Sequence, residues 1–267
     1  MDAILQDRPA VAPWAAPRML RLPGTEALDP AAWLTRDVAF AGQMALRDRL
    51  IAEREREVHA LLPGAGHAAA ELRDLVLDHL ARAPGYARAG AAMRRPDSVA
   101  VPLDDPPLVV AGRLVQEDLC LLDRPEGAAE HVLVGAILCF PSNWTLAQKL
   151  GRGLLRIHAP VERYDPEMAR RVQRMLDNLR PEAPVMRANL LIHDGFALHN
   201  PKVEGEKHYA APGAGRYVRV ERQVLLRLPR TRAIVFSIHT SNVAAASLGP
   251  EDRAALEAAR PGALAPA

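Results

Sequence analysis

Aromatic residues are scarce in this chain: Phe, Trp and Tyr together make up 4% of its 267 residues. Proteins that bind single-stranded nucleic acid stack the bases on aromatic side chains and follow the backbone with a basic stripe. No run of Lys or Arg stands apart from neighbouring acidic residues, and the formal net charge is only +2. Nucleic-acid binding is therefore not expected of this protein.

Cysteine is also rare, since only Cys120 and Cys139 occur, each in an apolar segment of the kind that forms strands. This is too few for a disulfide framework, for a structural zinc site or for an iron–sulfur cluster held by this chain alone. Cysteines in such segments are usually buried and unreactive. We therefore expect no site built from thiolates.

Long apolar runs are missing as well. No segment approaches the ~18 apolar residues that a membrane-spanning helix needs. The first residues lack the basic start and apolar run of a secretory signal, so we expect a cytoplasmic protein without membrane contact. A chain with 49% hydrophobic and 25% charged residues has the composition of a globular protein, and its length allows one domain or two.

The first part of the chain is predicted to be helical after an extended arm. Residues 1–30 contain five prolines and show no periodicity. Asp29 is a typical helix cap and Pro30 a typical first-turn residue, so we expect a helical region over residues 31–61. A second helix is expected over residues 68–82, and a proline-rich link follows at 94–107.

The later part alternates between strands and helices. The apolar run at residues 108–122 is predicted to form one or two strands, and strands are also expected at 131–140, 185–192, 216–228 and 233–238. Helices are expected at 146–157 and 166–179. Antiparallel hairpins with segregated helices indicate an α+β fold. We divide the chain into an N-terminal arm and helical region (1–107), a core (108–245) and a tail (246–267), with one continuous domain as the alternative.

His158 is the most promising functional residue. It lies near the end of a segment, residues 136–160, in which a strand, a turn and a predicted helix are followed by a proline. A neutral imidazole at a helix end can bind haem iron through one nitrogen while the other donates to a backbone carbonyl. The alternative is a histidine satisfied inside the core. No CxxCH motif is present, so any haem would be bound without covalent attachment.

Three cations, Lys149, Arg152 and Arg156, occupy the predicted helix before His158 at spacings that place them near one face. Such cations can pair with haem propionates or another carboxylate, and the guanidinium of Arg suits the bidentate geometry. A solvated basic face is the alternative interpretation.

Charged residues also interrupt the apolar strands. A buried charge needs a partner, and pairing Glu117 or Glu221 with Arg187 or Arg222 across the sheet would supply one. Such pairs would be structural, and a catalytic role is the alternative.

Further histidines lie later in the chain. The spacing of His193, His199 and His208 fits no compact metal motif, which favours a solvent-facing loop. His239 is expected to end the last strand, where it is placed to face a pocket.

Three sequence blocks, residues 139–161, 115–122 and 219–238, resemble the haem-dependent oxidative N-demethylase family. The segment DPAAWL at 29–34 and the ERERE helix with its LLPG end also fit, so the resemblance covers residues 14–245. It implies a PAS-like antiparallel sheet with flanking helices and an N-terminal helical extension.

The resemblance further implies haem b as cofactor and dioxygen as co-substrate for oxidative demethylation of a small secondary or methylated amine, with release of an aldehyde. Electrons would come from partner flavin and iron–sulfur proteins, and an oligomer is compatible with this arrangement. His158 matches the ligand histidine, and Lys149, Arg152 and Arg156 become candidates for propionate contacts. Glu117 and Arg222 are candidates for the polar groups of the catalytic pocket.

Two positions depart from the family pattern: Leu190 stands where a tryptophan is common, and His239 where an arginine is usual. Leu190 favours a second hypothesis, a haem-PAS gas or redox sensor or a haem carrier without catalysis. A haem-free structural or small-molecule-binding subunit is a third.

Overall fold

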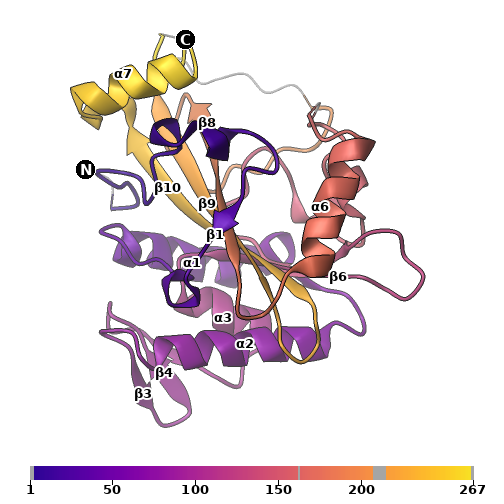
Figure 1. The fold of residues 1–267 in the computed structure, drawn as a ribbon. Helices are drawn as coiled ribbons and strands as arrows, with labels where there is room; N and C mark the ends of the chain where they lie inside the picture. Colours follow the sequence, from indigo (N-terminus) through magenta and orange to yellow (C-terminus); the bar gives the residue numbers. More distant parts are fainter. Residues whose placement is uncertain (1–2, 162, 207–214, 266–267) are drawn as a thin grey trace.

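The computed structural model describes residues 3–161, 163–206 and 215–265 and is built around a seven-stranded antiparallel sheet (Figure 1). Neighbouring strands follow the order β1-β8-β9-β10-β6-β7-β2. The strands are β1 (Glu26–Ala27), β8 (Val185–His193), β9 (Tyr217–Arg227), β10 (Ile234–Ala244), β6 (Asp118–Asp123), β7 (Val132–Ile137) and β2 (His59–Leu61).

Helices cover both faces of this sheet, as Figure 1 shows. One face, here called the α1–α3 face, carries α1 (Phe40–Val58), α2 (Gly66–Leu80) and α3 (Pro107–Leu114). The other, here called the α6 face, carries α4 (Leu146–Lys149), α5 (Leu154–Ile157) and α6 (Pro166–Asn178). The predicted α+β class is confirmed.

Strand alternation divides the apolar residues between two cores. On β6, Leu119 and Leu121 pack with α1–α3, whereas Cys120 and Leu122 pack with α6. Successive side chains of a strand point to opposite faces, so a strand buried on both sides needs an unbroken apolar run.

A buried ion pair joins α1 to the centre of the sheet. Arg47 Nη1 donates to Asp118 Oδ1 at 2.7 Å, and both side chains are buried. The same carboxylate accepts hydrogen bonds from the backbone N–H groups of Cys139, at 2.7 Å, and Phe140, at 2.9 Å. Asp118 therefore fixes the chain where it leaves β7 and enters the segment that carries His158.

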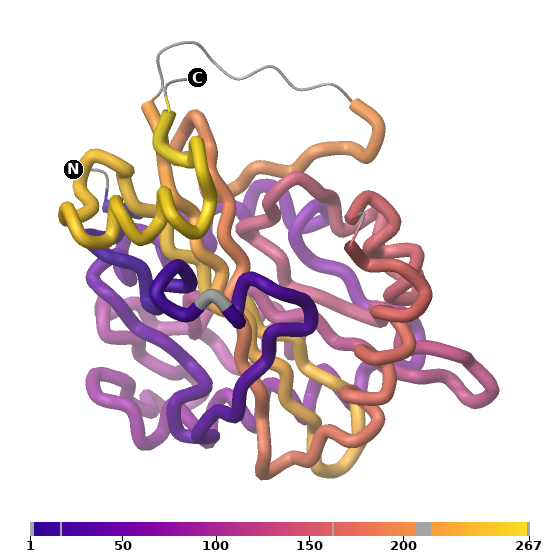
Figure 2. The backbone as a smooth tube through the Cα atoms, turned by 45° about the horizontal axis from the view of Figure 1, so that its top comes forward, coloured from indigo at the N-terminus to yellow at the C-terminus, as the bar shows by residue number. Residues whose placement is uncertain are grey.

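The N-terminal region belongs to the same sheet. Its strands β1 and β2 pair with β8 and β7 and form the two edges. The arm also lies beside the last helix, α7 (Pro250–Ala259), as Figure 2 shows, and Trp14 Nε1 donates to Asp252 Oδ1 at 2.8 Å. A division at residue 107 stays a prediction, although strands from before and after it share one sheet.

The link at 94–107 contains more structure than we expected. A small antiparallel sheet comprises β3 (Ala87–Ala89), β4 (Ala92–Arg94) and β5 (Ala100–Pro102). Among the described residues, no helix is long and apolar enough to cross a membrane.

The predicted strand at 108–122 is wrong in its first half, because Pro107–Leu114 forms α3 and β6 begins only at Asp118. An apolar run buried on nearly all sides has no period that separates helix from strand. Pro107 in the first turn was the signal for a helix.

The helical region predicted for 31–61 is also shorter than expected. Asp29 does cap a helix, since its side chain accepts a hydrogen bond from Ala31 N–H, but this is the short 3-10 turn Pro30–Ala32. The long helix α1 starts at Phe40, and residues 59–61 form β2 instead.

The single helix predicted for 146–157 is wrong. The chain forms α4, a turn with Gly151 at φ 73°, and then α5. Between the two helices the backbone bonds to β7, with Gly151 N–H donating to Leu133 O at 2.8 Å. Glycine adopts this left-handed conformation without the steric cost that other residues meet, so the break is local in origin.

Close packing of α3 on β7 generates a stability prediction. A Cβ on Gly112 would lie 2.4 Å from Ile137 Cγ1, whereas a Cβ on Gly66 in α2 would meet nothing within 4 Å. We expect Gly112→Ala to lower the free energy of unfolding by roughly 1–3 kcal/mol through overpacking. Urea unfolding measures it, with Gly66→Ala as control. If the two substitutions changed the free energy of unfolding equally, the close packing of Gly112 on Ile137 would not be supported.

Candidate functional site

His158 lies directly after α5 on the α6 face. Its Nδ1 is 2.9 Å from the carbonyl oxygen of Leu154, and a carbonyl only accepts, so Nδ1 carries the proton. The lone pair of Nε2 is then free to bind a metal. The imidazole also stacks on the Tyr164 ring, with centroids 4.2 Å apart and planes 20° apart, which fixes its orientation.

The surroundings keep this imidazole neutral. Burial lowers the pKa of His158, and the positive charges of Lys149 and Arg187 lower it further, against the opposing effects of the Leu154 hydrogen bond and Glu130. A histidine must be neutral to bind a metal through a ring nitrogen. Protonation state and hydrogen bonding therefore both suit His158 to the role of ligand.

The three cations predicted to share one helix face do not do so. Lys149 is buried, donating from Nζ to Ile157 O at 2.7 Å and to Glu204 Oε2 at 3.3 Å. Arg156 Nη1 also donates to Glu204, at 3.1 Å, whereas Arg152 is exposed. The break at Gly151 removes the helical spacing on which the prediction rested. Glu204 supplies a carboxylate for two of these cations.

A small cavity of about 210 Å³ lies beside α4. Its walls include Trp144, Lys149, Glu204 and Pro160, the last of these two residues beyond His158. It is smaller than the roughly 300–1,000 Å³ of typical ligand pockets. This cavity alone therefore does not define the site.

One strand of the sheet is incompletely covered on the α6 face. Along β8, Met186, Ala188 and Leu190 are buried on the α1–α3 face, whereas Arg187 and Asn189 on the α6 face are only half-buried. This alternation leaves polar side chains accessible on the α6 face, the side of the sheet that carries His158.

A hydrogen-bonded network continues from these residues across β9. Glu221 Oε1 accepts from Arg219 Nε at 3.2 Å, and its Oε2 accepts from Gln223 at 3.1 Å and Asn189 at 3.3 Å. Arg219 also donates to the carbonyl oxygen of Leu198 at 3.0 Å. Glu221 therefore pairs with Arg219 rather than with either of the arginines that the sequence analysis proposed.

Glu117 and Arg222 lie together, but on the opposite face of the sheet. Glu117 Oε1 accepts from Thr35 N–H at 2.7 Å, and Arg222 Nη1 donates to Thr35 Oγ1 at 3.2 Å. Arg222 faces the other way from its neighbour Gln223, which contacts Arg187. The structure thus brings the two predicted catalytic residues together and separates both from His158.

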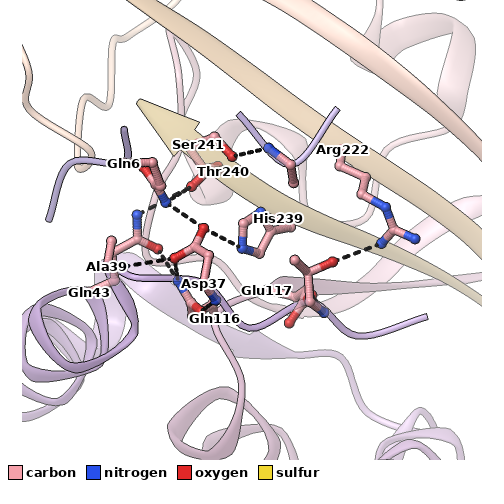
Figure 3. Close-up of polar contacts among 12 residues, drawn as sticks. Gln6, Asp37, Ala39, Gln43, Gln116, Glu117, Arg222, His239, Thr240 and Ser241 are labelled. Carbon is pink, nitrogen blue, oxygen red and sulfur yellow. Dashed lines mark hydrogen bonds and ion pairs between the residues drawn. The ribbon is translucent and has the colours of Figure 1, made fainter. Parts of the chain in front are cut away.

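His239 belongs to the same buried cluster (Figure 3). Its Nε2 lies 3.3 Å from Asp37 Oδ2, and Asp37 also accepts from Gln116 at 3.0 Å and Gln6 at 2.9 Å. Burial raises the pKa of Glu117, whose Oε2 has no hydrogen-bond partner among the described residues. The last strand runs on to Ala244, so the prediction that His239 ends it is wrong.

Sequence reasoning missed Asp37 and Gln6 as members of this cluster. Neither belongs to a recognisable motif, and both are roughly 200 residues or more from the strand that they contact. In the sequence, Asp37 indicates only a local turn. Its side chain does accept a hydrogen bond from Ala39 N–H, two residues later, at 3.0 Å.

The other predicted side chains have structural contacts. His193 Nε2 is 3.2 Å from Ser142 Oγ, and His199 Nδ1 donates to Cys139 O at 2.8 Å, whereas His208 falls outside the described residues. Cys120 and Cys139 are both free and buried. Within 3–161, 163–206 and 215–265, no group of three or more His, Cys, Asp or Glu residues could hold a metal ion.

The fold and His158 together describe an α+β protein in which an imidazole on the α6 face carries its proton on Nδ1, leaving Nε2 unprotonated. The sequence pattern of one protein family, described as "Haem-dependent oxidative N-demethylase, alpha subunit-like", matches residues 24–260. The chain therefore belongs to this family, and its matched region includes both faces of the sheet.

The half-buried Asp37 carboxylate should make the stability of the fold depend on pH. Burial alone would raise its pKa, but His239, Gln116 and Gln6 together lower it from 3.8 to about 2. The folded protein therefore gains stability from the ionised carboxylate above about pH 4, and loses it as the pH falls toward 2. We expect Asp37→Asn to remove about 2 kcal/mol at neutral pH.

Urea unfolding of both proteins between pH 7 and pH 2 measures this effect. The difference in unfolding free energy should be largest near neutral pH and should shrink in acid. Asp104→Asn, which removes an exposed carboxylate, controls for the change in net charge. A difference that stays constant down to pH 2 would contradict the role of Asp37.

Proposed function

We propose that this protein is the haem-binding chain of an enzyme that oxidatively demethylates a small secondary or methylated amine. The family match supports the class of reaction. The observation that carries the proposal is the His158 imidazole, with Nδ1 fixed by Leu154 and Nε2 therefore unprotonated. A PAS-like relationship of the sheet, haem b as the form of the cofactor and a cytoplasmic location stay predictions.

The side chains of this site include a donor group of the kind that haem iron binds. Haem iron accepts a neutral imidazole nitrogen, and the ligating histidine commonly donates its other N–H to a backbone carbonyl. His158 meets both conditions. When bound, the haem would supply the activation of dioxygen and the oxidation of the N-methyl carbon.

The chain's own residues would bind and orient the reactants. Leu154 O keeps the proton on His158 Nδ1, and stacking on Tyr164 holds the ring plane. Ile157 and Met168 pack onto the adjoining apolar core, to which Tyr164 also belongs. Asn189, whose amide nitrogen donates to Glu221, is half-buried on the same side of the sheet, and its amide oxygen is able to accept a hydrogen bond from an amine.

Electrons must come from other proteins, because the chain has no motif for a reductase of its own. Partner flavin and iron–sulfur proteins are the proposed source, consistent with the words "alpha subunit-like" in the family description. The oligomeric state is left open by this proposal.

The departure at Leu190 does not favour a sensor over an enzyme. Leu190 is buried in the core of the α1–α3 face, opposite His158, and His239 is buried on that face too. Neither side chain lies beside the proposed ligand. A haem sensor or carrier is therefore distinguished by experiment alone.

The first experiment is the ultraviolet–visible spectrum of the protein supplied with haem. We expect a Soret band in the unchanged protein and its shift or loss in His158→Ala, because the iron would lose its imidazole. His67→Ala, which removes an exposed histidine on α2, should leave the band unchanged. An unaltered band in His158→Ala would move the ligand elsewhere, with His193 on the same sheet face tested next.

Turnover separates an enzyme from a sensor. With dioxygen, a chemical reductant and a methylated amine, we expect aldehyde release that depends on His158. Normal dioxygen binding without any amine-dependent spectral change or aldehyde would instead support a sensor or carrier. Absence of haem binding would leave a haem-free subunit.

A further inference from the structure

Arg187 has an unusual position among the charged residues of the α6 face. Its guanidinium is half-buried on β8 and binds the arm at Pro23. The preceding residue, Leu22, packs onto the same apolar core as Leu154 and Tyr164, which contact His158. Arg187 Nε donates to Pro23 O at 3.1 Å and Nη1 donates to Gln223 Oε1. Nη2 has no hydrogen-bond partner in the part of the chain that the structure describes.

The charge of Arg187 also lacks a carboxylate partner. Among the described residues, no Asp or Glu oxygen lies within 4 Å of its guanidinium nitrogens. Glu221 is the nearest acidic neighbour along the sheet, but its oxygens already accept from Arg219, Gln223 and Asn189. Burying a cation without a counter-charge is costly, and here burial lowers the pKa of Arg187 against the weaker effect of Glu221.

The other cations near His158 are not in this situation. Lys149 and Arg156 share Glu204, and Arg152 is exposed to solvent, which screens its charge. Arg227, also on this side of the sheet, is buried without a carboxylate, but its three guanidinium nitrogens donate to the carbonyl oxygens of Leu179, Arg232 and Leu176. Arg187, by contrast, is partly desolvated, has no anion and keeps Nη2 without a partner, within the described ranges.

Gln223 holds the guanidinium of Arg187 in place through Nη1. Its Oε1 accepts from Arg187, while its Nε2 donates to Glu221 at 3.1 Å, so both ends of the amide are engaged. A guanidinium fixed in this way loses little entropy on binding a planar carboxylate.

We propose that Arg187, positioned by Gln223, binds a carboxylate of the ligand held against His158. This inference rests on the proposed function. The carboxylate has two possible sources: a propionate of the haem, or the acid group of an N-methyl amino acid as substrate. In both cases a carboxylate binds the guanidinium. Arg187 thereby replaces Lys149, Arg152 and Arg156 as the proposed partner of a propionate.

Haem titrations test the first source. Soret absorbance gives the dissociation constants of haem and of haem dimethyl ester for the unchanged protein, Arg187→Gln and Arg187→Lys. If a propionate binds Arg187, Arg187→Gln should weaken haem binding about ten- to a hundredfold and affect the diester far less. Arg187→Lys should restore part of the loss. Arg152→Gln, the matched control, should leave both constants unchanged.

Amine titrations of the haem-loaded protein test the second source. If the substrate supplies the carboxylate, N-methylglycine should shift the spectrum at lower concentration than dimethylamine in the unchanged protein. That preference should disappear in Arg187→Gln. Haem and haem dimethyl ester should then have similar dissociation constants, both for this variant and for the unchanged protein.

The inference is overturned if the unchanged protein binds haem no more tightly than haem dimethyl ester and also shows no preference for N-methylglycine over dimethylamine. Both of those comparisons use the unchanged protein, so a variant that fails to fold does not obscure them. It is also overturned if folded Arg187→Gln behaves as the unchanged protein in both titrations. Failure of the proposed function has a different signature, namely no His158-dependent Soret band in the unchanged protein.

Discussion

The ion pair between Arg47 and Asp118 fixes the segment on which the candidate site depends. One carboxylate binds a guanidinium from α1 and two backbone N–H groups just after β7. Removing one partner of such a buried pair typically costs roughly 3–5 kcal/mol, because the other charge is left uncompensated. The start of the segment that leads to His158 is therefore tied to the sheet centre, whereas its later part is held by backbone hydrogen bonds to β7.

Strand alternation places two polar groups of residues on opposite faces of one sheet. Arg222 and His239 face α1–α3, where they are sealed beneath the arm that carries Thr35 and Asp37. Arg187 and Asn189 face α6 and remain partly accessible, although Glu221 on that face is buried. Chemistry on a small ligand requires access, so the α6 face is suited to a reaction and the buried cluster to stability. A one-residue shift in strand register would exchange these roles.

Sequence patterns predicted the elements whose hydrophobic period was clear, such as α2, α6 and the strands β8 and β9. They failed at α3, where burial on nearly all sides removes the period, and at Gly151, where one backbone conformation breaks a helix. The place of His158 after a helix was predictable from the sequence, and its role as a ligand stays a prediction. The role that we propose for Arg187 was not predictable, since it depends on which carboxylates lie near that residue in space.

The cluster around His239 has a consequence for the order in which the chain can fold. Asn242 N–H donates to Gln6 Oε1 across 236 residues, and Asp37 meets His239 across a similar separation. Contacts between residues so distant in sequence form late, because a long loop must close first. During synthesis the first arm must wait until β10 has left the ribosome before its polar groups find their partners. The protein is therefore completed as one unit rather than from its N-terminus onward.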